Sequence, residues 1–333
     1  FWQRPDCWMR TRRIRCRHAL DLEACREDVA PRQASPDQSH RGAWSGGEVE
    51  LIVAAGSRED KAMKRGFDPG CSEEPFRSLA QEYPGESAYP PDQFRVEWGP
   101  IFHRGRLDGS ARVLVIGQDP AQHEAVVRRI LVGEAGRRIQ GFLAKLGITR
   151  SYAMINTFLY SVYGSVKAAT RKNPVLVAYR NRWIDALMAS GRIEAVVGLG
   201  VSAREAWELW KATPAGQAST VAFAAITHPT QPESASGKDR AKLEQATKTL
   251  LANWNLALSA LAPAITHPDV PRPIKPYGTA WADGDRTPVP EGDIPAGLPA
   301  WMHEQDGWAA RKGKDDLAKR RNITITVPKG VIA

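Results

Sequence analysis

Short apolar segments alternate with longer segments of helical length in the middle of the chain, and this alternation constrains the fold more than any other feature. The apolar segments are residues 112–116, 152–156, 193–198 and 221–227. Each has the length and composition of a strand that is buried on both faces of a sheet. The segment between the second and third begins with Pro174 near its first turn and is followed by Gly191, which are helix start and stop signals.

Strands that alternate with helices predict a parallel sheet covered by helices on both faces. We therefore expect an α/β protein with a three-layer αβα architecture and a central four-stranded parallel sheet. Helices are expected over residues 124–131, 134–146, 174–190, 202–210 and 239–261. Right-handed crossovers would place the carboxyl ends of the strands, and the loops that follow them, on one edge of the sheet.

Composition divides the 333 residues into three regions. Residues 1–62 combine an arginine run with scattered Pro and Gly and no periodicity, which predicts a disordered or loosely attached basic segment. Residues 63–262 contain the alternating segments and are expected to form the folded domain. Residues 263–333 begin rich in Pro and Gly and are expected to be an extension that packs on this domain.

The formal net charge is +9, which suits a polyanionic partner such as DNA because phosphate contacts release counterions. Membrane surfaces and acidic proteins also attract basic chains. No apolar run approaches the roughly 18–20 residues that span a bilayer, and the first residues lack an apolar stretch of signal-peptide length. We therefore expect a soluble, cytoplasmic protein that makes no membrane contact, and a monomer.

Polar residues follow three of the predicted strands where each strand ends. Gly117-Gln118-Asp119-Pro120 follows the first, Asn156 closes the second, and His228-Pro229 closes the fourth. Singly, each has an ordinary explanation as a turn former or a satisfied polar residue. Ligands of doubly wound sheets bind beyond the carboxyl ends of the strands, so the three together predict a site.

These segments resemble the motifs of the uracil-DNA glycosylase superfamily. VLVIGQDPA (113–121), INT (155–157) and HPTQPES (228–234) are similar to its three site motifs, in the same order. VGEAGRRIQGFLAKLGI (132–148) resembles a helix start of its iron–sulfur branch, and the resemblance spans about 112–261. It implies a glycosylase that hydrolyses the N-glycosidic bond of flipped uracil in DNA, leaving an abasic site and free uracil, without a cofactor.

The resemblance also implies a role for each polar residue. Asp119 would position the attacking water and counter positive charge on the sugar, and His228 would donate to uracil O2 as charge develops there. Asn156 would accept from uracil N3–H and donate to O4, a pattern that cytosine reverses. Gln118 would contribute its backbone to the pocket floor.

Further residues of these motifs are expected to contact DNA or the base. Gly117, Pro120, Pro229 and Pro232 resemble the elements that grip the phosphates, and either Gln231 or Pro232 stands where a wedge residue enters the duplex. His123 could contact a phosphate or face solvent as an ordinary helix residue.

The sequence departs from the family pattern at the base pocket. Ala121 replaces the Tyr that crowds uracil C5, and Leu131 stands where a stacking aromatic is expected. Phe158 or Tyr160 could supply that platform, or either could belong to the core. Cys7, Cys16, Cys25 and Cys71 lack the spacing of a metal or cluster motif, so a divergent member without metal is expected.

Three alternative functions remain open from the sequence. A protein of this fold could bind uracil or abasic DNA without turnover, or it could act on another base such as hypoxanthine. A different α/β hydrolase, such as an esterase, is disfavoured because no GxSxG elbow occurs.

Overall fold

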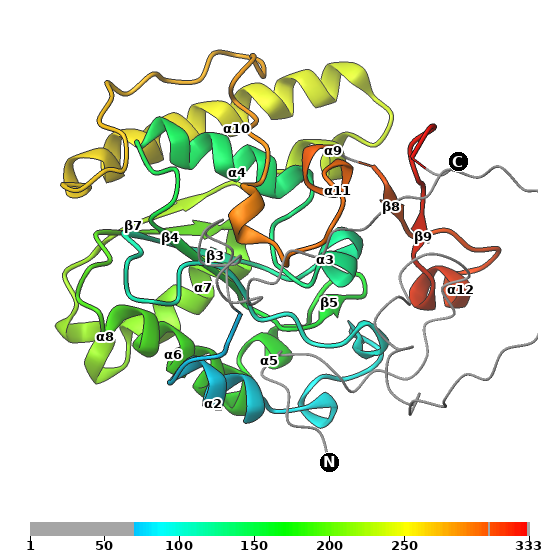
Figure 1. The fold of residues 1–333 in the computed structure, drawn as a ribbon, viewed down its shortest axis with the longest axis horizontal. Coiled ribbons are helices and arrows are strands. Elements are labelled where there is room, and N and C mark those ends of the chain that lie inside the picture. The colour runs from blue at the N-terminus through cyan, green and yellow to red at the C-terminus, as the bar shows by residue number, and fades with distance from the viewer. Residues whose placement is uncertain (1–69, 306, 332–333) are drawn as a thin grey trace, which may run out of the picture.

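The computed structural model describes residues 70–305 and 307–331, and a central five-stranded sheet organises them (Figure 1). Its strand order is β2-β4-β3-β6-β7. The strands are β2 (His103–Gly105), β3 (Val113–Gly117), β4 (Tyr152–Asn156), β6 (Ala195–Leu199) and β7 (Ala222–Ile226). The four strands expected from the apolar runs are present and mutually parallel. The expected four-stranded parallel sheet gains a fifth strand, because β2 pairs antiparallel with β4 at one edge.

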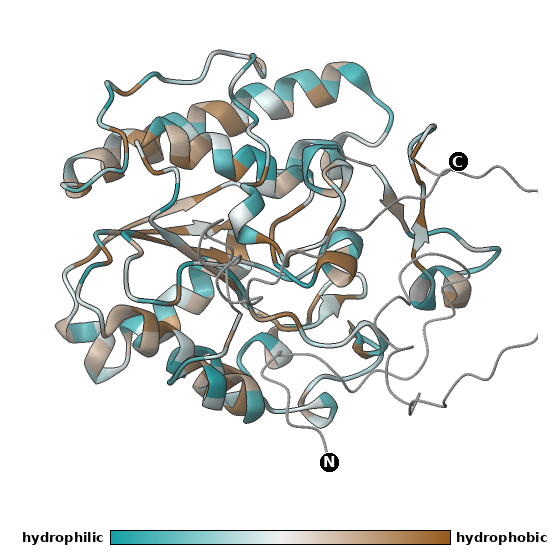
Figure 2. Cartoon of the chain, in the orientation of Figure 1, coloured by the Kyte–Doolittle hydropathy of each residue, from teal (hydrophilic) through white to brown (hydrophobic). Residues whose placement is uncertain are grey.

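Helices cover both faces of this sheet, which confirms the three-layer αβα architecture (Figure 1). One layer contains α4 (Glu134–Lys145) and α10 (Arg240–Leu261), and the other contains α2 (Phe76–Gln81), α6 (Pro174–Met188) and α7 (Gly200–Lys211). Side chains of β3 alternate between them: Val113 and Val115 pack toward the first layer, Leu114 and Ile116 toward the second. Figure 2 shows hydrophobic residues along the central strands and mixed faces on the covering helices.

Shorter elements connect or extend these layers. The helices among them are α3 (Gln122–Val127), α5 (Ala168–Arg171), α8 (Pro214–Ala218), α9 (Gln231–Ser236), α11 (Trp301–Glu304) and α12 (Asp316–Arg321). The 3-10 turns are η1 (Glu86–Ala88), η2 (Val96–Trp98), η3 (Ala262–Ala264) and η4 (Glu291–Asp293). Two antiparallel strand pairs are β1 (Phe94–Arg95) with β5 (Ser161–Val162) and β8 (Ala309–Ala310) with β9 (Thr324–Ile325).

Local capping explains where the long helices begin. The Asn173 side chain accepts the Val175 N–H at the start of α6, and Asp239 accepts the Lys242 N–H at the start of α10. A helix was expected over residues 124–131, and its predicted end is wrong because α3 stops at Val127. Arg128 takes a left-handed conformation there (φ 64°) and donates to the carbonyls of Trp98 and Pro100.

Residues beyond α10 pack against α3 and the loop that follows it. A hydrophobic cluster joins Val127 and Val132 to residues of this C-terminal segment, namely Val289, Ile294, Trp301, Met302 and Trp308. In Figure 1, β8 and β9 lie beside α3. The arginine-rich segment 1–62 lies outside the described residues. Within the described part of the chain, every helix is too short or too polar to cross a lipid bilayer.

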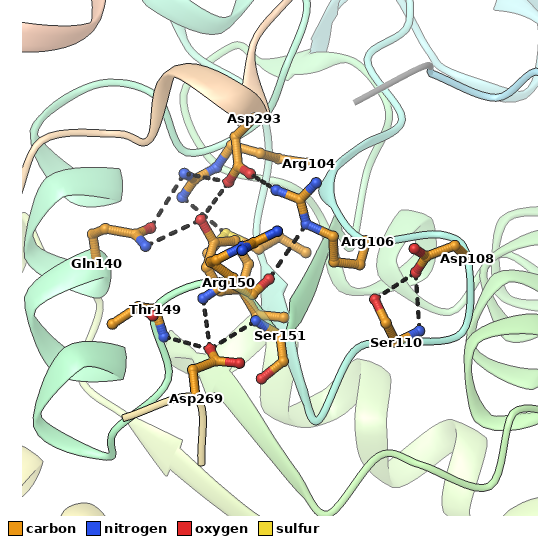
Figure 3. A network of polar contacts seen from close by, with 12 residues as sticks. Arg104, Arg106, Asp108, Ser110, Gln140, Thr149, Arg150, Ser151, Asp269 and Asp293 are labelled. Carbon is orange, nitrogen blue, oxygen red and sulfur yellow. Dashed lines mark hydrogen bonds and ion pairs between the residues drawn. The ribbon is translucent and has the colours of Figure 1, made fainter. Parts of the chain in front are cut away.

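A buried ionic network fastens η4 to the edge strand β2 (Figure 3). Asp293 is fully buried and pairs with both Arg104 and Arg106. Tyr152 donates its hydroxyl hydrogen to the same carboxylate, and Gln140 bridges Tyr152 and Arg104 with contacts of 3.0 and 3.2 Å. The buried Arg104 and the partly buried Arg106 therefore receive their counter-ion from a residue nearly 190 positions later in the chain.

Candidate active site

The carboxyl ends of β3 and β4 bring Gly117 and Asn156 into contact. The two residues are register partners in the parallel ladder. A Cβ atom on Gly117 would lie 2.3 Å from Asn156 Oδ1, so glycine alone leaves room for this amide. Asn156 is 6% exposed, and its Oδ1 has no hydrogen-bond partner within the described part of the chain. A buried acceptor without a partner costs about 1–3 kcal/mol, which a ligand donor would recover.

The loop after β3 crosses the point where the strand order reverses. β3 lies between β4 and β6, so the crevice between the ends of β3 and β6 is the topological switch point of this sheet. Gln118 spans that crevice: its Oε1 accepts from Ser202 Oγ at 3.1 Å, and its Nε2 donates to Asp119 Oδ1 at 3.0 Å. Its backbone carbonyl accepts from the Phe158 N–H at 2.9 Å, which joins this loop to the residues after β4.

Asp119 is held by its neighbours in a partly buried position. Its Oδ2 accepts from the Val162 N–H at 2.8 Å. Burial raises the pKa of this carboxyl to about 6, although the hydrogen bonds from Val162 and Gln118 lower it. Asp119 is therefore mainly a carboxylate at neutral pH and becomes protonated in mild acid. Such a group can orient water and oppose positive charge.

His228 follows β7 and is neutral at physiological pH. Burial, together with the Arg138 charge, lowers the pKa of its imidazole to about 4. Its Nδ1 accepts from the Thr230 N–H at 3.4 Å and lies 3.2 Å from Thr230 Oγ1. An Nδ1 that accepts leaves the single ring proton on Nε2, so the neutral ring can donate one hydrogen bond.

Arg138 of α4 anchors the loop that carries His228. Its guanidinium donates to the Pro229 carbonyl and pairs with Glu233 of α9 at 2.6 Å and with Glu134 at 2.7 Å. It also lies 4.5 Å from the ring centroid of Trp281, in the C-terminal segment. Sequence reasoning missed Arg138, because its partners in the His228 loop, Pro229 and Glu233, lie about 90 residues away in the chain. Its position one helical turn after Glu134 was the only local signal.

Glu124 joins the Asp119 loop to the loop before α4, and this residue was also missed. Its carboxylate accepts the N–H groups of Ala121, Val132 and Gly133 at 3.0, 3.0 and 3.3 Å. Leu131, just before this clamp, is buried and has a left-handed conformation (φ 54°). Strained backbone of this kind persists where surrounding contacts enforce it, often at functional sites.

His123 and Phe158, which were predicted to contact DNA and the base, pack against other parts of the protein. His123 is buried: its ring packs edge-on against Trp308 with centroids 4.8 Å apart, and Nε2 faces the Ala309 N–H. This places its side chain against the C-terminal segment. Phe158 is 1% exposed and packs edge-on against Phe94, so it is a core residue and its faces are not open to a base.

The remaining residues of the predicted site lie in the loops at this edge. Ala121 and Gln231 are exposed, while Pro120, Pro229 and Pro232 are buried. Gln231 and Pro232 begin α9. The structure therefore leaves Gln231, of the two possible wedge residues, the more accessible from solvent.

Direct contacts connect the three predicted polar segments. Gly117 meets Asn156, Gln118 meets Ser202 at the start of α7, and Gly200 of that helix lies against His228. Asp119, Asn156 and His228 thus belong to one continuous edge formed by the ends of β4, β3, β6 and β7. That edge offers a carboxylate, an unpartnered amide oxygen and a neutral imidazole donor. Within the described residues, no three His, Cys, Asp or Glu side chains gather closely enough to hold a metal ion.

Comparison with known protein families gives a match that covers the residues of this edge. Residues 104–252 match the family model of the uracil DNA glycosylase superfamily, a range that begins in β2 and ends within α10. No curated protein matches the chain. The matched range contains Asp119, Asn156 and His228 together with the Arg138 and Glu124 clamps. Residues 104–252 of this chain therefore form a domain of the uracil DNA glycosylase superfamily, a family of DNA glycosylases.

Proposed function

We propose that the protein hydrolyses the N-glycosidic bond of uracil flipped out of DNA, releasing free uracil and leaving an abasic site. The observation that carries the proposal is the buried, unpartnered Oδ1 of Asn156, held against Gly117 at the strand ends. A buried acceptor that has no protein partner favours a ligand that brings a donor.

The Asn156 amide matches the edge of uracil. Its Oδ1 can accept from N3–H while its Nδ2 donates to O4. Cytosine presents an acceptor at N3 and a donor at N4. The Asn156 Oδ1 acceptor would then face another acceptor, and its Nδ2 donor would face another donor. Each unsatisfied buried group costs about 1–3 kcal/mol, which supports discrimination against the ordinary base of DNA.

Asp119 and His228 supply complementary chemistry to the two halves of the breaking bond. The Asp119 carboxylate would orient a water toward C1′ and oppose the positive charge of the oxocarbenium-like sugar. His228 Nε2–H would donate to uracil O2 as the departing base gains negative charge. Comparable oxyanion donors are worth about 2.7–4 kcal/mol in the transition state. A neutral His228 matches this task because the donor is needed without a proton transfer.

The surrounding loops would hold the DNA while the base is out of the stack. In this proposal the Gly117 and Pro120 loop and the Pro229–Pro232 loop lie along the phosphates, and exposed Gln231 enters the gap left by the base. The exposed Ala121 would lie beside uracil C5, where its small side chain gives little steric exclusion of a 5-methyl group. Flipping costs a few kcal/mol and is cheapest at mismatched or single-stranded sites.

Base release from defined oligonucleotides tests the proposal. Single strands and duplexes with one uracil, thymine or hypoxanthine would be incubated with the enzyme, followed by alkaline cleavage of abasic sites. We expect strand cleavage at uracil only when the enzyme has acted, and far less after the same incubation with Asp119→Asn. Binding of uracil or abasic DNA without any cleavage would identify a non-catalytic binder, and release of hypoxanthine alone would assign a different base.

A further inference from the structure

Arg180 of α6 is a buried cation without an ionic or hydrogen-bonding partner among the residues that the structure describes. The residue is 3% exposed. Its Nε, Nη1 and Nη2 are all buried and have no hydrogen-bond partner within residues 70–305 and 307–331. The other deeply buried arginines described above behave differently: Arg104 meets Asp293, and Arg138 meets Glu233.

A small internal cavity lies beside this side chain. Its walls include Arg180, Tyr89, Tyr179, Leu176 and the Asn156-Thr157 segment at the end of β4. Its volume is about 10 Å³, which is close to the smallest space that holds a single water-sized species and too little for a sulfate, a nucleotide or an organic acid. The cavity lies in the layer of α6, where Ile155, Phe158 and Trp183 form the surrounding core.

The charges around Arg180 compensate it only in part. Burial lowers the pKa of the guanidinium to about 10, so it stays protonated near neutral pH. Burial also raises the pKa of Tyr89, so this phenol is neutral there. The charge of Glu205 partly offsets that of Arg180, but this carboxylate forms its ion pairs with Arg171 at 2.7 Å and Lys172 at 3.8 Å. A water molecule would supply an acceptor without charge, whereas a buried cation needs a counter-charge.

We propose that this cavity binds a single monatomic anion of chloride size, with the Arg180 guanidinium as its principal donor. The anion neutralises the buried cation and accepts its N–H groups in a space that admits nothing larger. Because it binds the folded protein alone, it raises stability in proportion to the logarithm of its concentration above its dissociation constant. This inference does not depend on the proposed reaction.

Crystals of the wild-type protein grown or soaked in bromide give the direct test. We expect an anomalous peak at the bromine edge inside the cavity, within about 3.5 Å of a guanidinium nitrogen. Peaks confined to surface lysines and arginines, with the cavity empty or holding water, would overturn the proposal. This measurement needs no variant and no activity.

Thermal unfolding at constant ionic strength provides the second test. Replacing gluconate, which is too large for the cavity, with chloride should raise the midpoint of the wild type by roughly 2–4 °C. Arg180→Met should abolish this difference while filling a similar volume. Arg182→Met is the matched control, because Arg182 lies on the same helix, is exposed and pairs with Glu82. An equal chloride response in wild type and Arg180→Met would contradict the assignment.

Discussion

At the scale of single residues, Asp119 and His228 are tuned in opposite directions by the same cause. Burial disfavours the charged form of each, so it raises the pKa of Asp119 to about 6 and lowers that of His228 to about 4. Between these values both groups are predominantly neutral, and above about 6 the carboxylate forms while the imidazole stays neutral. The state that the proposed chemistry requires therefore exists above pH 6 and is lost in acid.

The pH dependence of base release should follow Asp119. We expect single-turnover rates to be constant above about pH 7 and to fall as pH decreases through 6, since protonation removes the carboxylate charge. Asp119→Asn should lower the rate by about 10²–10⁴-fold and remove this acid limb, while DNA binding measured by fluorescence anisotropy stays unchanged. Unchanged turnover in the variant would exclude Asp119 from the mechanism.

The preference for releasing uracil over cytosine should depend on the Asn156 amide. In Asn156→Asp, a carboxylate would face uracil O4, and we expect uracil release to fall about 10- to 100-fold because a donor is lost. A protonated carboxyl group can donate to N3 and accept from N4 of cytosine, so slow cytosine release should appear at low pH. Matched oligonucleotides with either base measure both effects. Asn173→Asp is the control, because aspartate also caps a helix, and it should retain uracil release.

The polar residues at the strand ends were identified from the sequence, but their supports were not. Asp119, Asn156 and His228 stand directly after apolar strands, which is a local signal. Glu124 and Arg138 form hydrogen bonds with backbone groups of other segments, and no sequence pattern predicts those partners. His123 and Phe158 were considered for the site because their neighbours in sequence are motif residues. Packing against Trp308 and Phe94 decides their surroundings, and that packing depends on tertiary structure.

At the scale of elements, the site depends on a close approach of β3 to β4 and on the α4–α9 contact. The Gly117 backbone leaves the space that the Asn156 amide occupies, and Arg138 of α4 fixes the loop between β7 and α9. The first contact joins the ends of two neighbouring strands, and the second joins α4, which follows β3, to the loop that follows β7. The positions of the site residues therefore depend on how the strands and the covering helices pack against one another.

Enlarging Gly117 should displace the amide and spare the fold. In Gly117→Ala, the new Cβ would lie 2.3 Å from Asn156 Oδ1, so the side chain must leave its position. We expect uracil release to fall at least tenfold, since misplacement by about 1 Å can cost 10²-fold. Gly278→Ala is the control, because its nearest heavy atom is 3.9 Å away. Equal activity of both variants would show that the Gly117–Asn156 contact is not needed.

Removing the Arg138 charge should loosen the His228 loop. Arg138→Met loses the bonds to Pro229 and Glu233, and we expect kcat to fall by about tenfold or more with partial recovery in Arg138→Lys. Steady-state kinetics on a uracil oligonucleotide would measure the change. Arg204→Met, which breaks only an exposed pair with Glu208 at 3.6 Å, should behave as wild type. Normal kinetics in Arg138→Met would remove this positioning role.

Most of the sheet was predictable because its parallel strands are continuous apolar runs, as strands buried on both faces must be. β2 was not, because His103, Arg104 and Gly105 show no apolar or alternating pattern. It is a strand only through pairing with β4 and through the carboxylate of Asp293. The early end of α3 has a similar origin, since Arg128 leaves the helix to bind carbonyls of η2 and the following loop.

At the scale of the whole molecule, the segment after α10 completes the interior of the domain. Asp293 supplies the negative charge for Arg104 and Arg106, and Trp308 covers His123. Asp269 accepts the N–H groups of Thr149, Arg150 and Ser151 at 2.7, 2.7 and 2.9 Å, which fixes the approach to β4 (Figure 3). The segment after α10 therefore makes contacts that support the same sheet that positions the site residues.

Neutralising Asp293 should lower the free energy of unfolding substantially. Asp293→Asn leaves the Arg104 charge buried without its counter-ion, and we expect the free energy of unfolding to fall by about 3–5 kcal/mol. Urea denaturation followed by tryptophan fluorescence would measure it. Asp283→Asn, at an exposed position of the same segment, should change stability by less than about 0.5 kcal/mol. Similar midpoints for the two variants would show that the network is not stabilising.

The position of Asp293 in the chain also has a consequence for biosynthesis. The ribosome synthesises Arg104 of β2 and the following Arg106 early, but the carboxylate that neutralises them emerges almost 190 codons later. Until then Arg104 lacks its counter-ion in the nascent chain, so the domain cannot complete its interior before synthesis has passed residue 293. A polypeptide that ends between α9 and η4 would contain the polar segments at the ends of β3, β4 and β7 and still lack the carboxylate that neutralises Arg104.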